Sequence, residues 1–166
     1  MSRSMTTAAA MCALATTSSR GQVAGHPKLG GVWVLDASKN IVDGQLGAPS
    51  AATSTIVEHG DTITIDREVS TSATGTIKGH TVWAVDGKPW KNTVPVNGES
   101  TEVASVLSWE KDTLVIHTTL TVQGTDVDQL DRWTVDADGQ TLVMRRSVSA
   151  GGQEFGSTTL TYVKRP

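Results

Sequence analysis

Residues 127–149 read VDQLDRWTVDADGQTLVMRRSVS and contain two alternating runs joined by one turn. Successive side chains of a strand point to opposite faces, so Trp133 shares a face with Asp131, and Met144 shares a face with Arg146. The turn between the runs is Asp-Ala-Asp-Gly, and a glycine after an aspartate favours a hairpin because it accepts a positive φ. The stretch therefore predicts an antiparallel hairpin whose inner face is mainly apolar but also carries charge.

The same pattern continues along the chain in both directions. Of the 166 residues, 49 are β-branched (24 Thr, 19 Val and 6 Ile), a type of side chain that fits a pleated sheet better than a helix. The connector 36–50 has room for one short helical turn, and no long helix is predicted. Short strands separated by turn residues are typical of a sandwich or a closed barrel. Nine strands are predicted, at residues 32–35, 53–58, 62–69, 76–85, 102–109, 113–123, 127–135, 141–149 and 155–164.

Polar groups on the apolar faces favour the barrel. Ile63 and Ile65, for example, share their face with Arg67. The core of a sandwich would have to pair each such charge, whereas a barrel can hold polar groups in its lumen. We therefore predict a single all-β domain over residues 26–166, an antiparallel up-and-down β-barrel of about 8–10 strands.

The first 25 residues have a different composition. They contain no acidic residue, and they combine Arg3, a short apolar run at 8–15 and small residues suited to signal-peptide cleavage. We expect either a secretory signal peptide, which would make the protein secreted or periplasmic, or a disordered leader that is not cleaved. Cleavage after residue 25 would leave 12 basic and 17 acidic residues, a net charge of −5, and would remove the one cysteine, Cys12.

Composition and motifs argue against several classes of function. The whole chain carries a net charge of −3 and no long basic run, unlike a nucleic-acid-binding protein. No apolar stretch approaches the roughly 20 residues that span a membrane as a helix. The sequence lacks the common zinc, phosphate-binding and nucleophile motifs, so no cofactor or metal is predicted. Asp126, Asp128 and Asp131 could bind a hard cation, but we interpret them as a solvated loop that enters a strand.

Three short motifs suggest a family. They are Gly31-Val32-Trp33 at the start of the first strand, the hairpin RWTVDADGQTL at 132–142, and Tyr162 in the last strand. In these motifs the chain resembles lipocalin-like barrels, in particular small secreted bacterial ones, over roughly residues 30–164. The resemblance implies a lumen that takes one small, mostly apolar molecule, and a contact between Trp33 and Arg146 or Arg145 that closes one end. The disulfide often found in secreted members is missing.

Aromatic and charged side chains on the inner faces are the candidates for ligand binding. An indole offers a flat apolar surface with one donor, and a guanidinium in the lumen could hold a carboxylate through two hydrogen bonds. The alternative roles are filling of the core and a buried arginine–aspartate pair. The candidate ligand-binding residues are Arg67, Trp83, Trp109, Trp133, Met144, Arg146 and Tyr162.

Three functions remain open. The first is non-catalytic binding of a small apolar or aromatic molecule, with or without an acidic group, in the lumen. The second is a cofactor-independent lyase, isomerase or hydrolase in which His117 or His80 acts with Asp131 and Tyr162 in proton transfer. For this alternative a histidine must lie beside a carboxylate in the lumen, although alternation places both histidines on outer faces. The third is a secreted module whose outer face binds a partner. We favour the first; the oligomeric state is not predicted.

Overall fold

The computed structural model describes residues 25–166 except 73–74, 97–98 and 123. The predicted leader, residues 1–25, lies outside the described residues apart from Gly25. The described chain forms one short 3-10 helix, η1 (Ala37–Lys39), and the strands β1 (Gly31–Leu35), β2 (Ile41–Gly44), β3 (Ala51–His59), β4 (Thr62–Thr71), β5 (Gly75–Ala84), β6 (Pro89–Val96), β7 (Glu99–Glu110), β8 (Thr113–Val122), β9 (Thr125–Val135), β10 (Thr141–Ala150) and β11 (Gln153–Lys164). In the part of the chain that the structure describes, no helix is long and apolar enough to cross a membrane.

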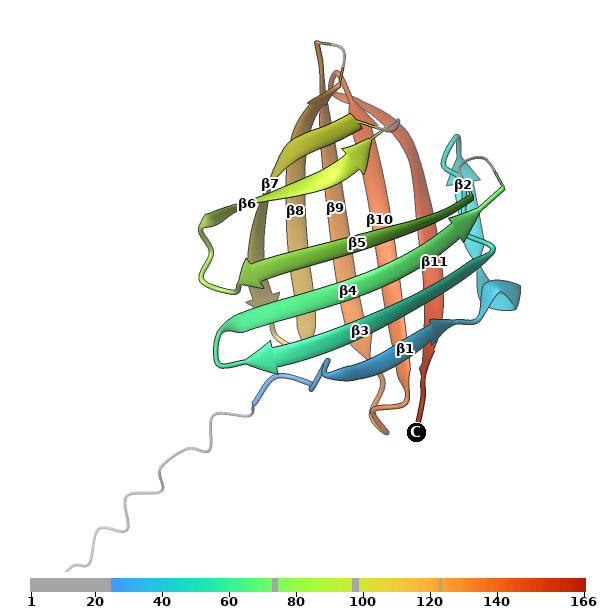
Figure 1. Ribbon diagram of the computed structural model, residues 1–166, viewed down its shortest axis with the longest axis vertical. Helices are drawn as coiled ribbons and strands as arrows, with labels where there is room; N and C mark the ends of the chain where they lie inside the picture. The colour runs from blue at the N-terminus through green and yellow to red at the C-terminus, as the bar shows by residue number, and fades with distance from the viewer. Residues whose placement is uncertain (1–24, 73–74, 97–98, 123) are drawn as a thin grey trace, which may run out of the picture.

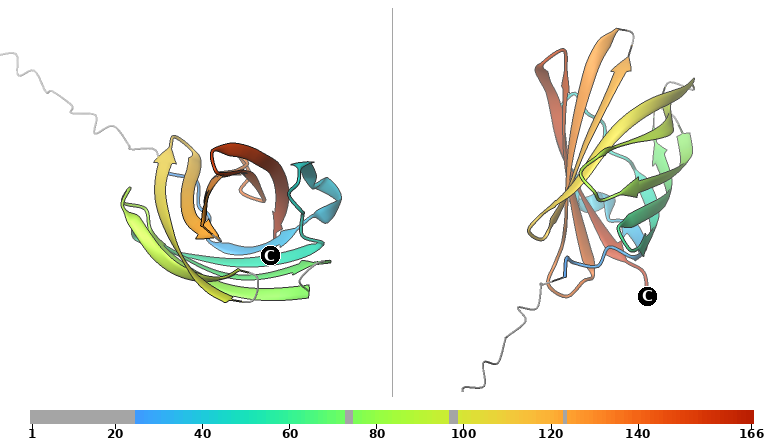
Figure 2. Two further views of the ribbon diagram at one scale, coloured as in Figure 1. Left: turned by 90° about the horizontal axis from the view of Figure 1, so that it is seen from above. Right: turned by 90° about the vertical axis from the view of Figure 1, so that its left-hand side faces the viewer.

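The strands form one antiparallel sheet that curls into a nearly closed barrel (Figures 1 and 2). Their order is β5-β4-β3-β1-β11-β10-β9-β8-β7-β6, and β2 pairs with β11 beside this path. The ladder between β1 and β11 joins the first and last strands, with Trp33 opposite Lys164. The predicted fold class is confirmed: the described residues form an all-β, antiparallel up-and-down barrel with ten strands around its axis.

Two strands were not predicted. The connector 36–50 contains the expected helical turn, η1, but also β2, a four-residue strand whose side chains are all exposed. β6 contains Pro89 and Pro95, which argue against a strand in the sequence. Proline is tolerated here because β6 lies at an edge of the sheet and pairs only with β7 in the described part of the chain.

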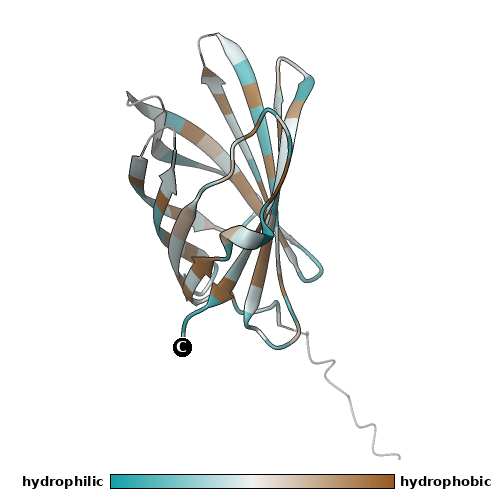
Figure 3. Cartoon of the chain, turned by 90° about the vertical axis from the view of Figure 1, so that its right-hand side faces the viewer, coloured by the Kyte–Doolittle hydropathy of each residue, from teal (hydrophilic) through white to brown (hydrophobic). Residues whose placement is uncertain are grey.

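Hydrophobic and hydrophilic residues alternate along the strands (Figure 3), and the buried hydrophobic ones form one core. The residues of the core come from both halves of the barrel and lie toward one end of it. They are Leu29, Trp33, Leu35, Ala52, Ile56, Ile63, Ile65, Leu107, Leu114, Ile116, Trp133, Leu142, Met144, Leu160 and Tyr162. We call this end, which carries the β7–β8 and β9–β10 turns, the closed end.

The segment before β1 helps to seal the closed end. Leu29 is only 1% exposed, and its carbonyl accepts a hydrogen bond from Trp33 Nε1 at 2.7 Å. His26 stacks on Trp109 with ring centroids 4.5 Å apart. The Lys164 ammonium lies 5.1 Å from the centroid of the Trp33 ring, where the resemblance to lipocalin-like barrels implied an arginine. A cation therefore does cover Trp33, but the last strand supplies it.

The sheet is open between β5 and β6. These two strands follow each other in the chain, yet they share no ladder among the described residues. The amide of Val82 instead donates a hydrogen bond to Asn92 Oδ1 at 3.1 Å, so a side chain takes the place of a backbone partner. We call this opening the seam.

A candidate ligand-binding cavity in the barrel lumen

A polar belt lies directly above the filled core. Cross-strand register places it on two neighbouring levels of the wall. Asp131 of β9 lies opposite Arg146 of β10, whereas Gln129, two residues before Asp131, lies opposite Thr118 of β8. Arg67 of β4 lies opposite Ser54 of β3. The same alternation that points the core residues inward points these side chains into the lumen. The belt consists of Ser54, Arg67, Ser105, Thr118, Gln129, Asp131 and Arg146.

The belt borders a cavity of about 290 Å3. Five residues singled out from the sequence line it, namely Arg67, Trp83, Asp131, Trp133 and Arg146. Eight others complete the lining: Gly79, Thr81, Val103, Ser105, Ile116, Thr118, Leu120 and Gln129. Alternation in the sequence also points these eight residues inward. For example, Gly79 and Thr81 share the face of Trp83, and Ile116 and Leu120 share one face of β8.

The guanidinium of Arg146 is paired with the carboxylate of Asp131. Its Nε donates to Asp131 Oδ1 at 2.7 Å and its Nη2 donates to Oδ2 at 2.8 Å, while Gln129 Nε2 donates to Oδ2 at 3.1 Å. Asp131 is only 4% exposed. Burial works against the charged form of Arg146, but the attraction of Asp131 outweighs it and the pKa of Arg146 is raised. The two charges therefore compensate each other.

Arg67 is placed differently. Its Nε donates to Ser54 Oγ at 3.2 Å, and its guanidinium carbon lies 5.6 Å from the centroid of a Trp133 ring. Among the described residues no carboxylate forms an ion pair with it. Burial lowers the pKa of Arg67 and the positive charge of Arg146 adds to this effect, while Tyr162 and the negative charge of Asp131 oppose it. The lumen thus holds one guanidinium whose charge is not matched by a paired carboxylate.

Two indoles form the apolar wall beside Arg67. Trp83 and Trp133 meet edge to face, with ring centroids 6.4 Å apart and an angle of 73° between the planes. Neither buried Nε1 has a hydrogen-bond partner in the described part of the chain. On the other side of the cavity, the hydroxyls of Ser105 and Thr118 bond to each other at 2.9 Å. The arrangement suits a flat or apolar ligand body with a polar end near Arg67.

The other three predicted ligand-binding residues do not line the cavity. Met144 and Tyr162 are buried in the core beneath the belt. Burial raises the pKa of Tyr162, although the charges of Arg67 and Arg146 oppose this. Trp109 lies at the closed end, where it stacks on His26. Alternation predicts which way a side chain points but not how far along the barrel axis it lies.

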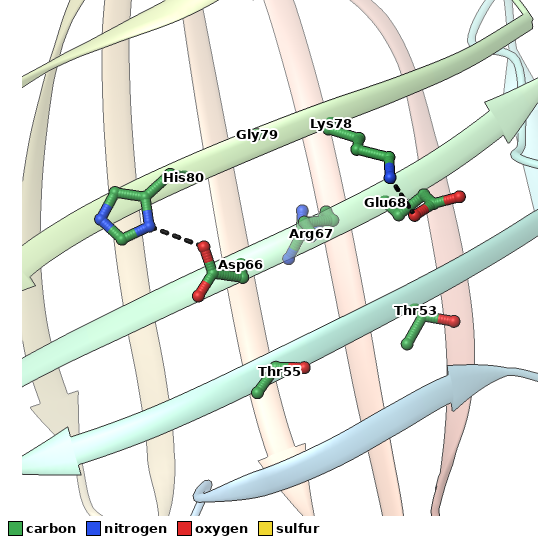
Figure 4. A pocket seen from close by; sticks show the side chains of 8 residues that line it. All are labelled: Thr53, Thr55, Asp66, Arg67, Glu68, Lys78, Gly79 and His80. Atoms are coloured by element: carbon green, nitrogen blue, oxygen red, sulfur yellow. Dashed lines mark hydrogen bonds and ion pairs between the residues drawn. The ribbon is translucent and has the colours of Figure 1, made fainter.

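Both strand histidines lie on the outer face. His80 is 61% exposed and its Nδ1 is 2.7 Å from Asp66 Oδ1, beside the ion pair of Lys78 with Glu68 at 3.2 Å (Figure 4). His117 Nε2 is 3.2 Å from Asp128 Oδ1 and is also exposed. No histidine is among the described residues that line the cavity. The structure thus does not provide the histidine–carboxylate contact in the lumen that the enzyme alternative requires.

The three aspartates of β9 do not act together. The interpretation as a loop that enters a strand is wrong for Asp126, because β9 begins at Thr125 rather than at residue 127; Asp128 and Asp131 lie within the strand as predicted. Asp126 accepts a hydrogen bond from Thr121, Asp128 faces His117 on the outside, and Asp131 faces the lumen. Within the described residues no group of three or more His, Cys, Asp or Glu side chains could hold a metal ion.

Comparisons with known proteins bear on the fold. No family model and no curated protein matches the chain. Among solved structures, a secretory abundant heat soluble protein from Ramazzottius varieornatus is similar with a TM-score of 0.53 and 14% identity, over 85% of this chain and 97% of that one. The fold is that of a calycin-like β-barrel.

Two further structures share this fold and were solved with ligands. A Schistosoma mansoni fatty acid binding protein in complex with arachidonic acid has a TM-score of 0.51 and 15% identity, over 82% of this chain and 96% of that one. The zebrafish ileal bile acid-binding protein complexed with cholic acid has a TM-score of 0.50 and 16% identity, over 82% of this chain and 98% of that one.

Proposed function

We propose that this protein binds one small, mostly apolar or aromatic molecule with an acidic group in the barrel lumen, without catalysis. The observation that carries the proposal is the environment of Arg67. Its guanidinium faces the lumen, and within the described chain it forms one hydrogen bond to Ser54 and no ion pair. A half-buried cation without a paired carboxylate is unfavourable, and a ligand carboxylate would supply the missing charge.

The charges of the belt support a monoanion. Two guanidiniums, Arg67 and Arg146, face one carboxylate, Asp131, so these three groups leave one positive charge. Arg146 already uses two nitrogens on Asp131. We therefore infer that Arg67, rather than both arginines equally, binds the acidic group of the ligand.

The size and the lining of the cavity support a compact ligand. The volume of about 290 Å3 lies just below the range of roughly 300–1,000 Å3 that is typical of small-molecule sites. Trp83, Trp133, Ile116, Leu120 and Val103 provide an apolar surface. The similar barrels solved with arachidonic acid and cholic acid also hold acids with large apolar bodies. An aromatic or short aliphatic acid fits this space best.

A matched pair of probes tests the proposal. Calorimetry would compare naphthoate with its neutral amide, binding to the wild type, to Arg67→Met and to Arg132→Met, which changes an outer-face arginine. A charge-assisted hydrogen bond contributes about 1.5–3 kcal/mol, so we expect naphthoate to bind the wild type at least about tenfold more tightly than the amide. Arg67→Met should remove this preference and Arg132→Met should keep it.

Two results would overturn the proposal. One is the absence of naphthoate and short-chain carboxylate binding to the wild type. The other is an unchanged affinity for naphthoate in Arg67→Met. Native mass spectrometry of the protein as purified provides an independent measurement, since a bound acid would appear as a constant added mass that is lost in Arg67→Met.

We also propose that residues 1–25 direct export, so that the barrel acts in a secreted or periplasmic location. The support is the composition of this segment, with a basic residue near its start, an apolar run and no acidic residue. Expression of the full chain, followed by intact-mass measurement of the exported fraction, tests it. Recovery of only the uncleaved chain inside the cells would contradict the proposal.

A further inference from the structure

Gly79 occupies the middle of β5 and is unusual there. Its neighbour across the ladder is Arg67, and the pairing of β4 with β5 is regular from Thr62 opposite Ala84 to Thr71 opposite Gly75. A glycine inside a strand weakens it, because the residue loses more backbone freedom on folding and has no side chain to pack. The presence of a glycine at this position therefore needs a physical explanation.

The usual structural reasons do not apply to Gly79. Its backbone is not in the left-handed region that favours glycine, whereas Gly75 at the start of the same strand has a φ of +69°. The ladder has no bulge at this point. No atom of the described protein lies within 4 Å of the position that a Cβ would occupy, so no neighbouring chain needs the space. Open space of this kind, beside a cavity, suits the close approach of a ligand, which is another common reason for glycine inside a strand.

The space beside Gly79 lies where the proposed ligand needs it. Gly79 and Arg67 both line the lumen cavity, and both also border the groove on the outer face of β3, β4 and β5 (Figure 4). Gly79 itself is exposed, and β5 has no ladder partner on the side of the seam in the described chain. The cavity is thus open to solvent near Arg67, while Val103, Ile116 and Leu120 lie on the β7–β8 wall.

We propose that Gly79 determines specificity by keeping open the space in front of Arg67 in which the ligand's acidic end sits. This inference rests on the proposed function. The acidic end lies beside β4 and β5, near the seam, and the apolar body extends toward the β7–β8 wall. A side chain at position 79 would point into the same space, because Gly79 has the same parity along β5 as Thr81 and Trp83, which line the cavity.

A graded series tests this. Calorimetry would measure naphthoate and naphthalene binding to the wild type, Gly79→Ala and Gly79→Val. We expect the naphthoate affinity to fall in that order, by about tenfold or more for valine, because a larger side chain overpacks the space in which the acidic end sits. Naphthalene lacks the acidic end, so its affinity should change much less. The urea midpoint should rise in both variants, because valine and alanine restrict the unfolded chain and valine favours strands.

His80→Val is the matched control. It places the same side chain one residue further along β5 but on the outer face, where His80 is exposed. It should raise the urea midpoint and leave naphthoate binding unchanged. Failure of the wild type to bind any carboxylate probe would overturn the proposed function and this inference with it. Binding to the wild type with equal affinity for Gly79→Val, or an equal loss of naphthoate and naphthalene binding, would overturn the role of Gly79 alone.

Discussion

Two arginines in one lumen differ in what surrounds them. Arg146 is held by both oxygens of Asp131, and its pKa is raised; Arg67 has a serine and an indole as neighbours, and its pKa is lowered by burial. Similar depth in the barrel therefore leads to opposite electrostatic outcomes. The proposed function rests on this difference: Arg146 is paired within the barrel, and Arg67 has no paired carboxylate in the described chain.

Loss of the Asp131 charge should destabilise the protein strongly. Asp131→Asn would leave Arg146 and Arg67 in the lumen without a counter-ion. Breaking a buried pair costs about 3–5 kcal/mol, and Arg146 is 33% exposed, so we expect a loss of roughly 3 kcal/mol in the free energy of unfolding. Urea titration measures it. Asp128→Asn, on the outer face of the same strand, is the control and should change little; equal effects of the two substitutions would contradict this account.

Tyr162 should titrate at an abnormally high pH. Burial raises its pKa above the ordinary value of about 10, so the folded protein keeps the phenol proton after the unfolded chain has lost it. Its contribution to stability is complete below pH 10 and is lost as the pH rises through the folded-state value. Tyr162 is the one tyrosine of the sequence, so tyrosinate absorbance reports on it alone. The same midpoint in the folded protein and in urea would refute the prediction.

At the residue scale, the sequence predicts direction better than depth. Alternation points Arg67, Trp83 and Trp133 inward, and the structure has all three in the lining of the cavity. The same alternation also points Tyr162 inward and made it a candidate for ligand binding, although it lies in the core. The distance of a side chain along the axis depends on the tilt and stagger of all strands, and no single strand contains that information.

At the scale of elements, the seam is the weakest junction of the sheet. Among the residues that the structure describes, the hydrogen bond between β5 and β6 is the one from the Val82 amide to Asn92 Oδ1, apart from the turn that links them. The sequence did not predict this junction. The prolines of β6 argued against a strand there, and the predicted strand at 76–85 ended at a turn signal. An edge strand gives a weaker pattern than a central one, since fewer neighbours constrain it.

Asn92→Ala should loosen the seam without unfolding the barrel. The substitution removes the acceptor of the Val82 amide, so hydrogen exchange at Val82 should accelerate while exchange in β9 and β10 stays slow. The global cost should be about 1 kcal/mol, the usual net value of one hydrogen bond. Thr93→Ala, which changes an exposed neighbour, should leave Val82 unaffected. Unchanged exchange at Val82 in Asn92→Ala would show that this bond does not hold the seam.

At the scale of the whole molecule, the barrel is divided along its axis. The closed end is filled by the core and sealed by the segment before β1, and the belt and cavity follow above it. The sequence predicted one all-β domain and its barrel topology, because turn residues and alternation recur along nearly the whole chain. It did not predict which end is closed, since that depends on Leu29, which lies before the first predicted strand.

Leu29 should contribute to stability as much as a core strand residue does. It is 1% exposed and belongs to the core cluster. Leu29→Ala should lower the free energy of unfolding by about 2–5 kcal/mol, the range for a buried leucine, as measured by urea titration. Lys28→Ala, at an exposed neighbouring position, serves as the control. A cost below that of an ordinary surface substitution would mean that this segment does not seal the barrel.

The pairing of β1 with β11 has a consequence for how the protein folds. Most ladders of the described barrel join strands close together in the sequence, but this one and the neighbouring ladder of β2 with β11 join opposite ends of the domain. Contacts between distant segments form slowly, because loop closure costs entropy before any contact compensates for it. We therefore expect fast hairpin formation followed by one late closure step. The cavity does not exist before that step, so a bound acid should slow unfolding and leave the folding rate unchanged.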